Sequence, residues 1–265
     1  MKTLYFITGS QDLYGEETLA QAAKDSKEMA AYLNEQLCGI AGVVFQPVIR
    51  NSSEALDICT KASSDKDCVG VIMWMHTFSP AKMWINALKA LSKPMLHLHT
   101  QYNERLPYDS IDMDFMNLNQ SAHGDREFGF ICTRLGIKRE VVSGYYKHAD
   151  VIERVRHFAQ AAVAFGRGMR VAMFGNNMRD VAVTDGDRVE SEIKYGWNVN
   201  YYGIGDLCDI ISGITDEEID AKMAEYTEKY AMNTDNLAAV REQAKYEAAL
   251  EKFLARENIS AFTDT

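Results

Sequence analysis

The sequence predicts an α/β protein made of two consecutive Rossmann-like or flavodoxin-like domains, each with a parallel sheet flanked by helices. Two observations support this fold class. Short apolar runs alternate with helix-length amphipathic segments, which is the pattern of a parallel sheet covered by helices on both faces. The chain has 265 residues, of which 47% are hydrophobic, so it is long enough to bury a sizeable core in one or two domains.

Four apolar runs in the first part of the chain predict strands, and each is followed by a polar or glycine-containing break and a helical pattern. The expected strands are residues 4–8, 43–49, 68–75 and 94–99, and the expected helices between them are residues 16–38, 52–63 and 79–92. A long helical pattern at 149–166 ends in Gly166, Arg167 and Gly168, a combination typical of a helix stop and hinge. The hinge separates a first domain, residues 1–168, from a second, residues 169–265.

The second domain repeats the alternation of strands and helices. The expected elements are a strand at 169–177, a helix at 186–195, a strand at 197–204, helices near 216–230 and 235–256, and a final apolar-to-polar segment at 259–265. In open α/β sheets the functional loops follow the carboxyl ends of the strands. Because the last segment has the pattern of such a strand end, we expect the second domain to be incomplete at Thr265.

Charge and composition exclude several classes of function. The formal net charge is −10 and the basic residues are interspersed with acids, which argues against a nucleic-acid partner. No segment has the apolar length of a signal peptide or a membrane span, so we expect a soluble, cytoplasmic protein without a membrane partner. The five cysteines lie at wide, irregular spacings and are expected to be mostly buried thiols.

Common short motifs for nucleotide and hydrolase chemistry do not occur in the sequence. The first strand is followed by GSQDLYG, which is not a dinucleotide fingerprint, and there is no phosphate-binding G-x-x-x-x-G-K-[ST] motif. The sequence also lacks H-E-x-x-H and G-x-S-x-G. These absences disfavour a nucleotide-dependent oxidoreductase, a zincin and an α/β-hydrolase.

Neutral polar and aromatic side chains follow the predicted strands and are expected to share one edge of each sheet. They are Ser10, Gln11 and Tyr14 after the first strand, His76, Thr77 and Phe78 after the third, Thr100 and Gln101 after the fourth, and Asn176 and Asn177 after 169–175. Amides, hydroxyls and aromatic rings at such an edge suit a polyhydroxy ligand such as a sugar. Ordinary strand-end loops give the same pattern, so both interpretations stay open.

The densest polar cluster is the segment 117–127. Ser121, followed by a helical pattern from about Gly124, predicts a helix N-terminus. His123 would lie near the positive end of the helix dipole, which disfavours the imidazolium and favours a neutral imidazole that hydrogen-bonds to hydroxyls. A histidine that caps the helix or packs in the loop is the alternative.

Three further clusters are interpreted as structural. His97 and His99 share one face of a predicted strand, but without a matching third metal ligand we expect them to be hydrogen-bonded to neighbours. The carboxylate trio lacks the spacing of an EF-hand, and we expect loop and cap residues at Asp109, Asp112 and Asp114. An apolar cluster is expected to be core, namely Met73, Trp74, Met75, Met83 and Trp84. Met178 remains a candidate pocket wall.

Four segments carry a resemblance to a known family. They are GSQDLYG at 9–15, WMHTFSPAKMWI at 74–85, MNLNQSAHGDREFGFI at 116–131 and RVAMFGNNMRDVAVTDGDRVE at 170–190. In this order and at these intervals they resemble L-arabinose isomerase. The resemblance implies the fold of fucose and arabinose isomerases, with an N-terminal α/β domain at 1–168 and a truncated central α/β domain at 169–265.

The resemblance also implies an activity. The family interconverts L-arabinose and L-ribulose, and some members convert D-galactose to D-tagatose, through a metal-stabilised ene-diolate with a divalent cation, usually Mn²⁺. It implies a homohexamer, a dimer of trimers with active sites between subunits. The two glutamates and two histidines of the metal site lie beyond the matched region. The resemblance therefore implies no catalytic or metal-binding residue in this chain, and we expect the chain alone to be inactive.

The sugar-contacting residues that the resemblance implies are Gln11, Leu13, Tyr14, Phe78, Gln120, His123 and Met178. Many relatives have His where Asp12 stands here, and Asp12 can still accept a hydrogen bond but carries a charge. A non-catalytic sugar-binding or regulatory module is the alternative function. It predicts tight sugar binding without metal, whereas the isomerase interpretation predicts weak binding by this chain alone.

Overall fold

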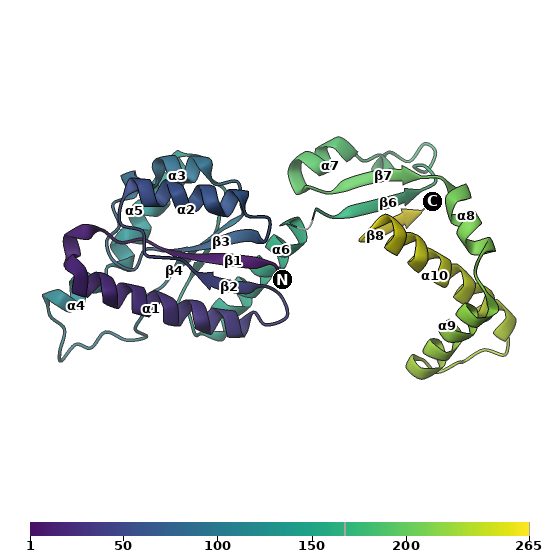
Figure 1. Ribbon diagram of the computed structural model, residues 1–265, viewed down its shortest axis with the longest axis horizontal. Coiled ribbons are helices and arrows are strands. Elements are labelled where there is room, and N and C mark those ends of the chain that lie inside the picture. The colour runs from purple at the N-terminus through teal and green to yellow at the C-terminus, as the bar shows by residue number, and fades with distance from the viewer. Residues whose placement is uncertain (167, 265) are drawn as a thin grey trace. The chain divides into compact units, whose positions relative to one another are not determined.

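The computed structural model describes residues 1–166 and 168–264, which form two compact units, Met1–Arg167 and Gly168–Thr265. Each unit is a parallel sheet flanked by helices (Figure 1), so the predicted α/β class is confirmed. Among the described residues, no helix combines the length and the apolar character that crossing a membrane requires.

The first unit contains a five-stranded parallel sheet of order β2-β1-β3-β4-β5. Its strands are β1 (Thr3–Thr8), β2 (Gly42–Phe45), β3 (Cys68–Trp74), β4 (Met95–His99) and β5 (Glu140–Ser143). All seven residues of the central strand β3 are buried. Such burial on both faces explains why β3 is a continuous apolar run in the sequence instead of an alternating one.

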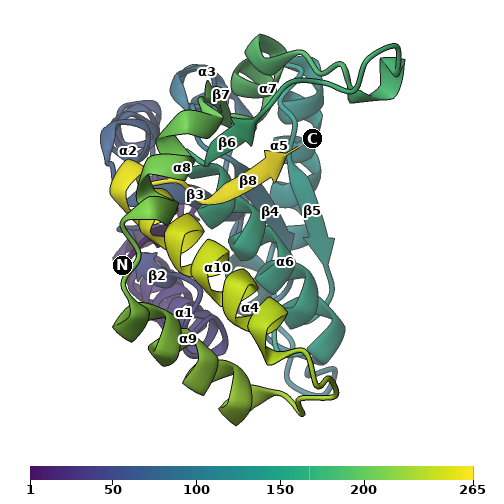
Figure 2. The same cartoon turned by 90° about the vertical axis from the view of Figure 1, so that its right-hand side faces the viewer.

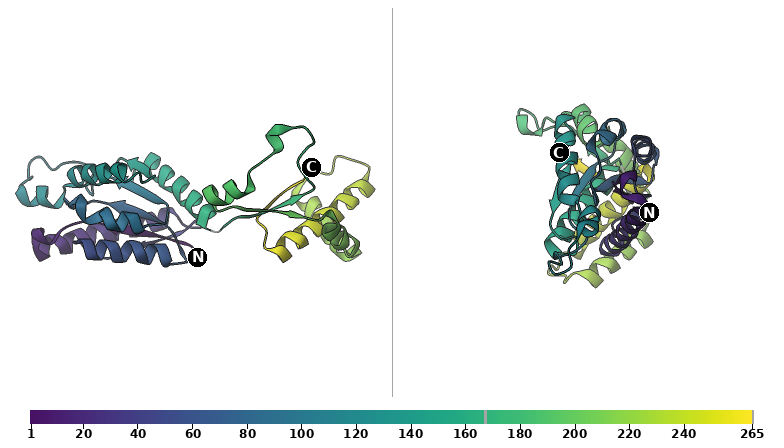
Figure 3. Two further views of the ribbon diagram at one scale, coloured as in Figure 1. Left: turned by 90° about the horizontal axis from the view of Figure 1, so that it is seen from above. Right: turned by 90° about the vertical axis from the view of Figure 1, so that its left-hand side faces the viewer.

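Helices cover both faces of this sheet (Figure 3). Residues of the sheet, α1 and α6 form one core cluster, and residues of the sheet, α2, α3 and α5 form the other. The helices are α1 (Gly15–Gln36), α2 (Ser52–Ser64), α3 (Ile85–Ala90), α4 (Met113–Leu118), α5 (Ser121–Arg134) and α6 (Ala149–Gly166), with short 3₁₀ turns η1 (Asp12–Tyr14) and η2 (Ala81–Trp84).

The apolar cluster that the sequence places in the core is buried in the structure. All five members are at most 7% exposed, namely Met73, Trp74, Met75, Met83 and Trp84. The Trp84 ring lies edge-on to Phe128 of α5 at 5.7 Å between ring centroids.

Three cysteines are buried, Cys59, Cys68 and Cys132, whereas Cys38 and Cys208 are exposed. The expectation that most of the cysteines are buried thiols is therefore confirmed.

The second unit contains a three-stranded parallel sheet of order β7-β6-β8 (Figure 2). Its strands are β6 (Arg170–Phe174), β7 (Asn198–Tyr202) and β8 (Ala261–Asp264), and its helices are η3 (Ala182–Thr184), α7 (Arg188–Tyr195), α8 (Ile204–Ser212), α9 (Asp216–Lys229) and α10 (Leu237–Glu257). Fully buried Phe253 of α10 packs edge-on against Phe174 and Tyr202, at 5.0 and 5.2 Å between ring centroids. This aromatic cluster joins α10 to the sheet.

Several boundaries differ from the sequence prediction. Strand β2 ends at Phe45 instead of residue 49, and the helix expected at 79–92 is divided into η2 and α3. Strand β5 was not predicted, because only Val142 of its four residues is buried and the apolar signal is correspondingly short. Helix α8 was also missed. It begins after Gly203, without a side-chain cap, and Gly205 weakens the helical pattern of its first turn.

Replacing Phe253 by Ala should destabilise the second unit by about 3–5 kcal/mol, because it empties the centre of its aromatic cluster. Hydrogen exchange of the Ala172 amide in β6 should become faster, whereas the amide of Ile72 in β3 should report no change. Phe262→Ala is the matched control, since Phe262 is 46% exposed. Equal effects of the two substitutions would contradict the assignment of Phe253 to the core.

Candidate functional site

The loops that follow β1 and β3 meet at the carboxyl edge of the first sheet. The amide of Gly9 donates to the carbonyl of Trp74 at 2.9 Å, and the Thr77 hydroxyl donates to the Ser10 hydroxyl at 2.7 Å. A Cβ atom on Gly9 would lie 2.6 Å from the Met75 sulfur and 2.9 Å from Ser79 Cβ, so a larger residue would force these buried side chains to shift. Since Ser10 and Thr77 are fully buried, these polar residues fix the two loops to each other.

The start of α5 is held against the loop after β3. The amide of Gln120 donates to the His76 carbonyl at 3.1 Å, and the Ser121 hydroxyl donates to the same carbonyl at 3.2 Å. A Cβ on Gly124 would lie 2.8 Å from the Thr77 carbonyl oxygen, a backbone atom, so a larger residue would push the helix away. The predicted helix N-terminus is confirmed, with the helix beginning at Ser121 itself and not near Gly124.

Two acidic side chains of α5 accept hydrogen bonds from backbone amides that follow β3. Asp125 Oδ1 accepts from the Met75 amide at 3.3 Å, and Glu127 Oε2 accepts from the Ala81 amide at 2.9 Å. His123 and Arg126 of the same helix are exposed. The polar segment 117–127 therefore combines residues that fix the helix with residues that are free to meet a ligand.

Three of the candidate sugar-contacting residues lie together where α5 begins. The His123 ring is edge-on to half-buried Phe78 at 6.4 Å between ring centroids. Gln120 precedes the first residue of α5, and its side-chain amide donates to the Asn117 side chain at 3.3 Å. The imidazole and the aromatic ring thus lie against each other within one turn of the residue that carries the amide, and these three kinds of group suit a polyhydroxy ligand.

The loop after β1 carries a second group of candidates around η1. Gln11 and Tyr14 are half-buried, whereas Leu13 is 84% exposed. Asp12 forms an ion pair with Arg50 at 3.2 Å. The contact between Ser10 and Thr77 brings this loop to the same edge of the sheet as Phe78. The role of these residues in sugar binding stays a prediction.

The remaining candidate, Met178, belongs to the second unit. It follows β6 and is 57% exposed. The neighbouring Asn176 accepts a hydrogen bond from the Tyr201 hydroxyl at 3.0 Å, and the Asn177 side chain donates to Asp185. These contacts tie the loop after β6 to the following segments of the second unit.

A cavity of about 330 Å³ lies at the carboxyl ends of β4 and β5. Its lining mixes polar and apolar groups and comprises His99, Thr100, Gln101, Asn103, Glu104, Leu106, Ala122, Gly144 and Tyr145. Thr100 and Gln101, which the sequence places at a strand end, therefore border a space open to a small ligand. Ala122 brings the first turn of α5 to the same cavity.

Of the two histidines of β4, His97 has the hydrogen-bonded structural role that the sequence predicts, whereas His99 is half-buried, borders the cavity and lies 3.8 Å from Asp125 Oδ2, beyond hydrogen-bond distance. Their rings are stacked, with centroids 6.2 Å apart, and His97 Nε2 lies 2.7 Å from Asp125 Oδ1. Burial and the nearby Arg139 charge lower the pKa of His97 to about 4, and burial raises the pKa of the Asp125 carboxyl well above its usual value. Both shifts disfavour the charged forms, and the contact between His97 and Asp125 joins β4 to α5.

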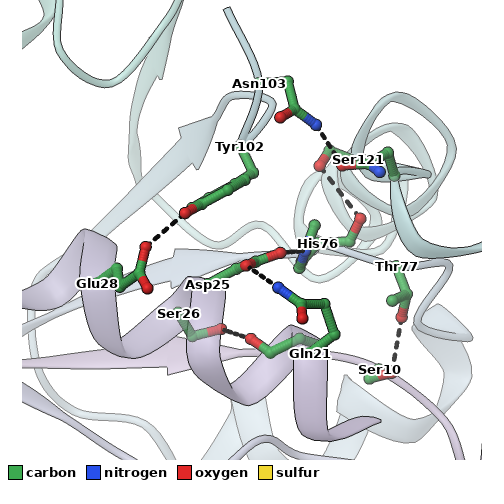
Figure 4. A network of polar contacts seen from close by, with 12 residues as sticks. Ser10, Gln21, Asp25, Ser26, Glu28, His76, Thr77, Tyr102, Asn103 and Ser121 are labelled. Carbon is green, nitrogen blue, oxygen red and sulfur yellow. Dashed lines mark hydrogen bonds and ion pairs between the residues drawn. The ribbon is translucent and has the colours of Figure 1, made fainter. Parts of the chain in front are cut away.

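Sequence reasoning missed a buried network centred on His76 and Asp25 (Figure 4). His76 was noted only as a strand-end residue, and Asp25 was not noted at all. The signal for Asp25 lies in helical spacing, since Ala22, Ser26 and Met29 place it on the buried face of α1. A charged residue on such a face requires a partner, and the partner is 51 positions away in the sequence.

The other acidic and histidine residues do not form a metal centre in the described part of the chain. Within residues 1–166 and 168–264, no three His, Cys, Asp or Glu side chains converge as metal ligands. Of the aspartate trio, Asp112 caps α4 by accepting from the Phe115 amide at 2.8 Å, which confirms the expected cap.

The His97 imidazole should stay uncharged as the pH falls from about 8 to about 5, because its pKa of about 4 lies below the ordinary value of 6.5. Nitrogen-15 NMR of the imidazole, with His97→Gln to assign its signals, measures this directly. A titration of the His97 signals with a midpoint near 6.5 would show that the buried pair with Asp125 is wrongly described.

Comparison with known proteins gives two family matches that divide the chain between them. Residues 1–169 match the L-arabinose isomerase N-terminal domain, and residues 170–265 match the L-arabinose isomerase central domain. Three curated relatives, each named L-arabinose isomerase, come from Shouchella clausii (49% identical over 264 residues), Thermotoga petrophila (48% over 265) and Clostridium beijerinckii (49% over 262).

Each alignment covers 98% of this chain but only 53–54% of the relative. The chain thus spans about half the length of the curated relatives it matches. The ordered motifs, the α/β fold and the family matches all agree. The chain therefore belongs to the L-arabinose isomerase family.

Proposed function

We propose that these 265 residues supply the sugar-facing part of an aldose–ketose isomerase that converts L-arabinose to L-ribulose. The proposal is supported above all by the grouping of Phe78, Gln120 and His123 at the start of α5. Family membership supports an isomerase, and the relatives are named for L-arabinose. D-galactose, which has more hydroxyl groups of the same kind, is the second substrate that we propose.

Each group in this arrangement has a distinct task in binding. The Gln120 amide and the His123 imidazole both donate and accept hydrogen bonds, so they can orient neighbouring hydroxyls of an open-chain sugar. Phe78 supplies an apolar wall against the C–H face of the sugar. We also assign Gln11, Leu13 and Tyr14 of the η1 loop to the surround of the sugar. In the second unit, considered by itself, Met178 is the residue that we propose as a sugar contact.

We propose Mn²⁺ as the cofactor of the complete enzyme, in which it would polarise the sugar oxygens. The described residues do not fit this metal, because no three potential ligands converge among them. We therefore assign proton transfer between C1 and C2, and metal binding, to no residue of this chain.

We further propose that the complete enzyme is cytoplasmic and is a homohexamer of two trimers, in which α5 of one subunit reaches the pocket of a neighbour.

The purified 265-residue chain should form no L-ribulose from L-arabinose in the presence of Mn²⁺, because its described residues offer no metal-bound carboxylate pair. A colorimetric ketose assay, with an active L-arabinose isomerase as positive control, measures this. Clear turnover by the chain would require a metal site that includes His97, His99 or the aspartates of 109–114. Tight binding of L-arabinose without metal, measured by calorimetry, would instead favour the non-catalytic sugar-binding module.

In the product of the complete reading frame, Gln120→Ala and His123→Ala should each lower kcat/KM for L-arabinose by about tenfold, the loss expected for one or two hydrogen bonds to hydroxyls. The matched controls are Gln160→Ala and His157→Ala, whose side chains are exposed on α6. Steady-state kinetics with Mn²⁺ present provides the comparison. If site and control variants had equal kcat/KM, Gln120 and His123 would not be sugar contacts.

A further inference from the structure

The side chain of His76 is fixed on several sides. Its Nε2 lies 2.9 Å from Asp25 Oδ2, and both residues are at most 1% exposed. Because a carboxylate oxygen only accepts, the imidazole donates from Nε2. The ring also stacks on Trp74, with centroids 4.2 Å apart and planes 14° from parallel. His76 thus has one well-defined position between α1 and the end of β3.

Asp25 is itself held in place by its own helix. Its second carboxylate oxygen accepts from the Gln21 side chain at 2.7 Å, one helical turn earlier (Figure 4). Burying a carboxylate is costly unless its oxygens are hydrogen-bonded. Because Gln21 and His76 occupy both oxygens, replacing either partner would leave a buried acceptor without a donor.

The backbone carbonyl of His76 links this fixed side chain to the start of α5. Its carbonyl oxygen accepts two hydrogen bonds, from the Gln120 amide at 3.1 Å and from the Ser121 hydroxyl at 3.2 Å. The next residue, Thr77, donates to Ser10 in the loop that leads to Gln11. His76 and Thr77 together therefore connect α1, the start of α5 and the loop after β1.

We propose that His76 is a positioning residue, whose contact with buried Asp25 sets the place of Gln120 and His123 through its backbone carbonyl. This inference rests on the proposed function for the statement that Gln120 and His123 meet the sugar. The other statement, that the His76 imidazole fixes the His76 carbonyl and that this carbonyl fixes α5, rests on the contacts alone. His76 touches no substrate in this scheme and takes no part in proton transfer.

The test compares His76→Leu, which removes the donor to Asp25, with His76→Gln, whose side-chain amide can still donate to it. Hydrogen exchange of the Gln120 amide reports the bond to the His76 carbonyl, and the amide of Ile58 within α2 reports general stability. Asp25→Ala, which keeps the imidazole but removes its acceptor, is the second disruptive variant should His76→Leu fail to fold. His157→Leu on the exposed face of α6 is the control.

We expect the disruptive variants to accelerate exchange at Gln120 at least about tenfold relative to Ile58, as loss of one buried hydrogen bond would do. His76→Gln should stay within about threefold of the unchanged chain. Equal acceleration at Gln120 and Ile58 would overturn the proposal, because His76 would then act on stability alone. Failure of His76→Gln to restore protection would overturn it as well.

Kinetics of the complete gene product separate this inference from the proposed function. If Gln120 and His123 bind the sugar, His76→Leu should lower kcat/KM for L-arabinose by about tenfold and His76→Gln should restore it. Absence of isomerisation in the unchanged product would refute the proposed function but leave the exchange result intact. Loss of protection at Gln120 with unchanged kcat/KM would refute the link between the helix position and the sugar.

Discussion

The close approach of α5 to the end of β3 is the constraint on which the candidate site depends. The His76 carbonyl accepts two hydrogen bonds from the start of the helix, and Gly124 leaves room for the helix to lie against Thr77. Without this approach, Gln120 and His123 would not share one place with Phe78. The parallel sheet makes it possible, because the carboxyl ends of its strands bring loops from distant parts of the chain to one edge.

Much of the fold could be predicted from the sequence, because its signals are local. Continuous apolar runs mark strands that are buried on both faces, and β3 is the clearest case. The amphipathic spacing of α1 likewise follows from one buried face. Elements with little buried surface gave weaker signals. Edge strand β5 buries only Val142, and α8 starts without a side-chain cap, so neither was predicted.

The candidate site, like the fold, could be predicted from the sequence only in part. Residues at strand ends, such as Gln11 and Phe78, could be found because position in the pattern places them at the functional edge. The groups that hold them could not be found, since each is a pair distant in sequence. Asp25 and His76 are 51 positions apart, and His97 and Asp125 are 28. Their pairing is a property of how helices pack on the sheet, which periodicity does not encode.

The two faces of α5 have a consequence for redesigning this protein. On one face, Gly124 and Asp125 lie against the end of β3 and the loop after it, and Glu127 at the margin of the helix accepts from the Ala81 amide. On the other face, His123, Arg126 and Phe130 are exposed. A mutant library aimed at a new ligand can therefore vary the exposed positions freely while the anchoring positions keep their residues. The two sets of positions are interleaved within eight consecutive residues of one short motif.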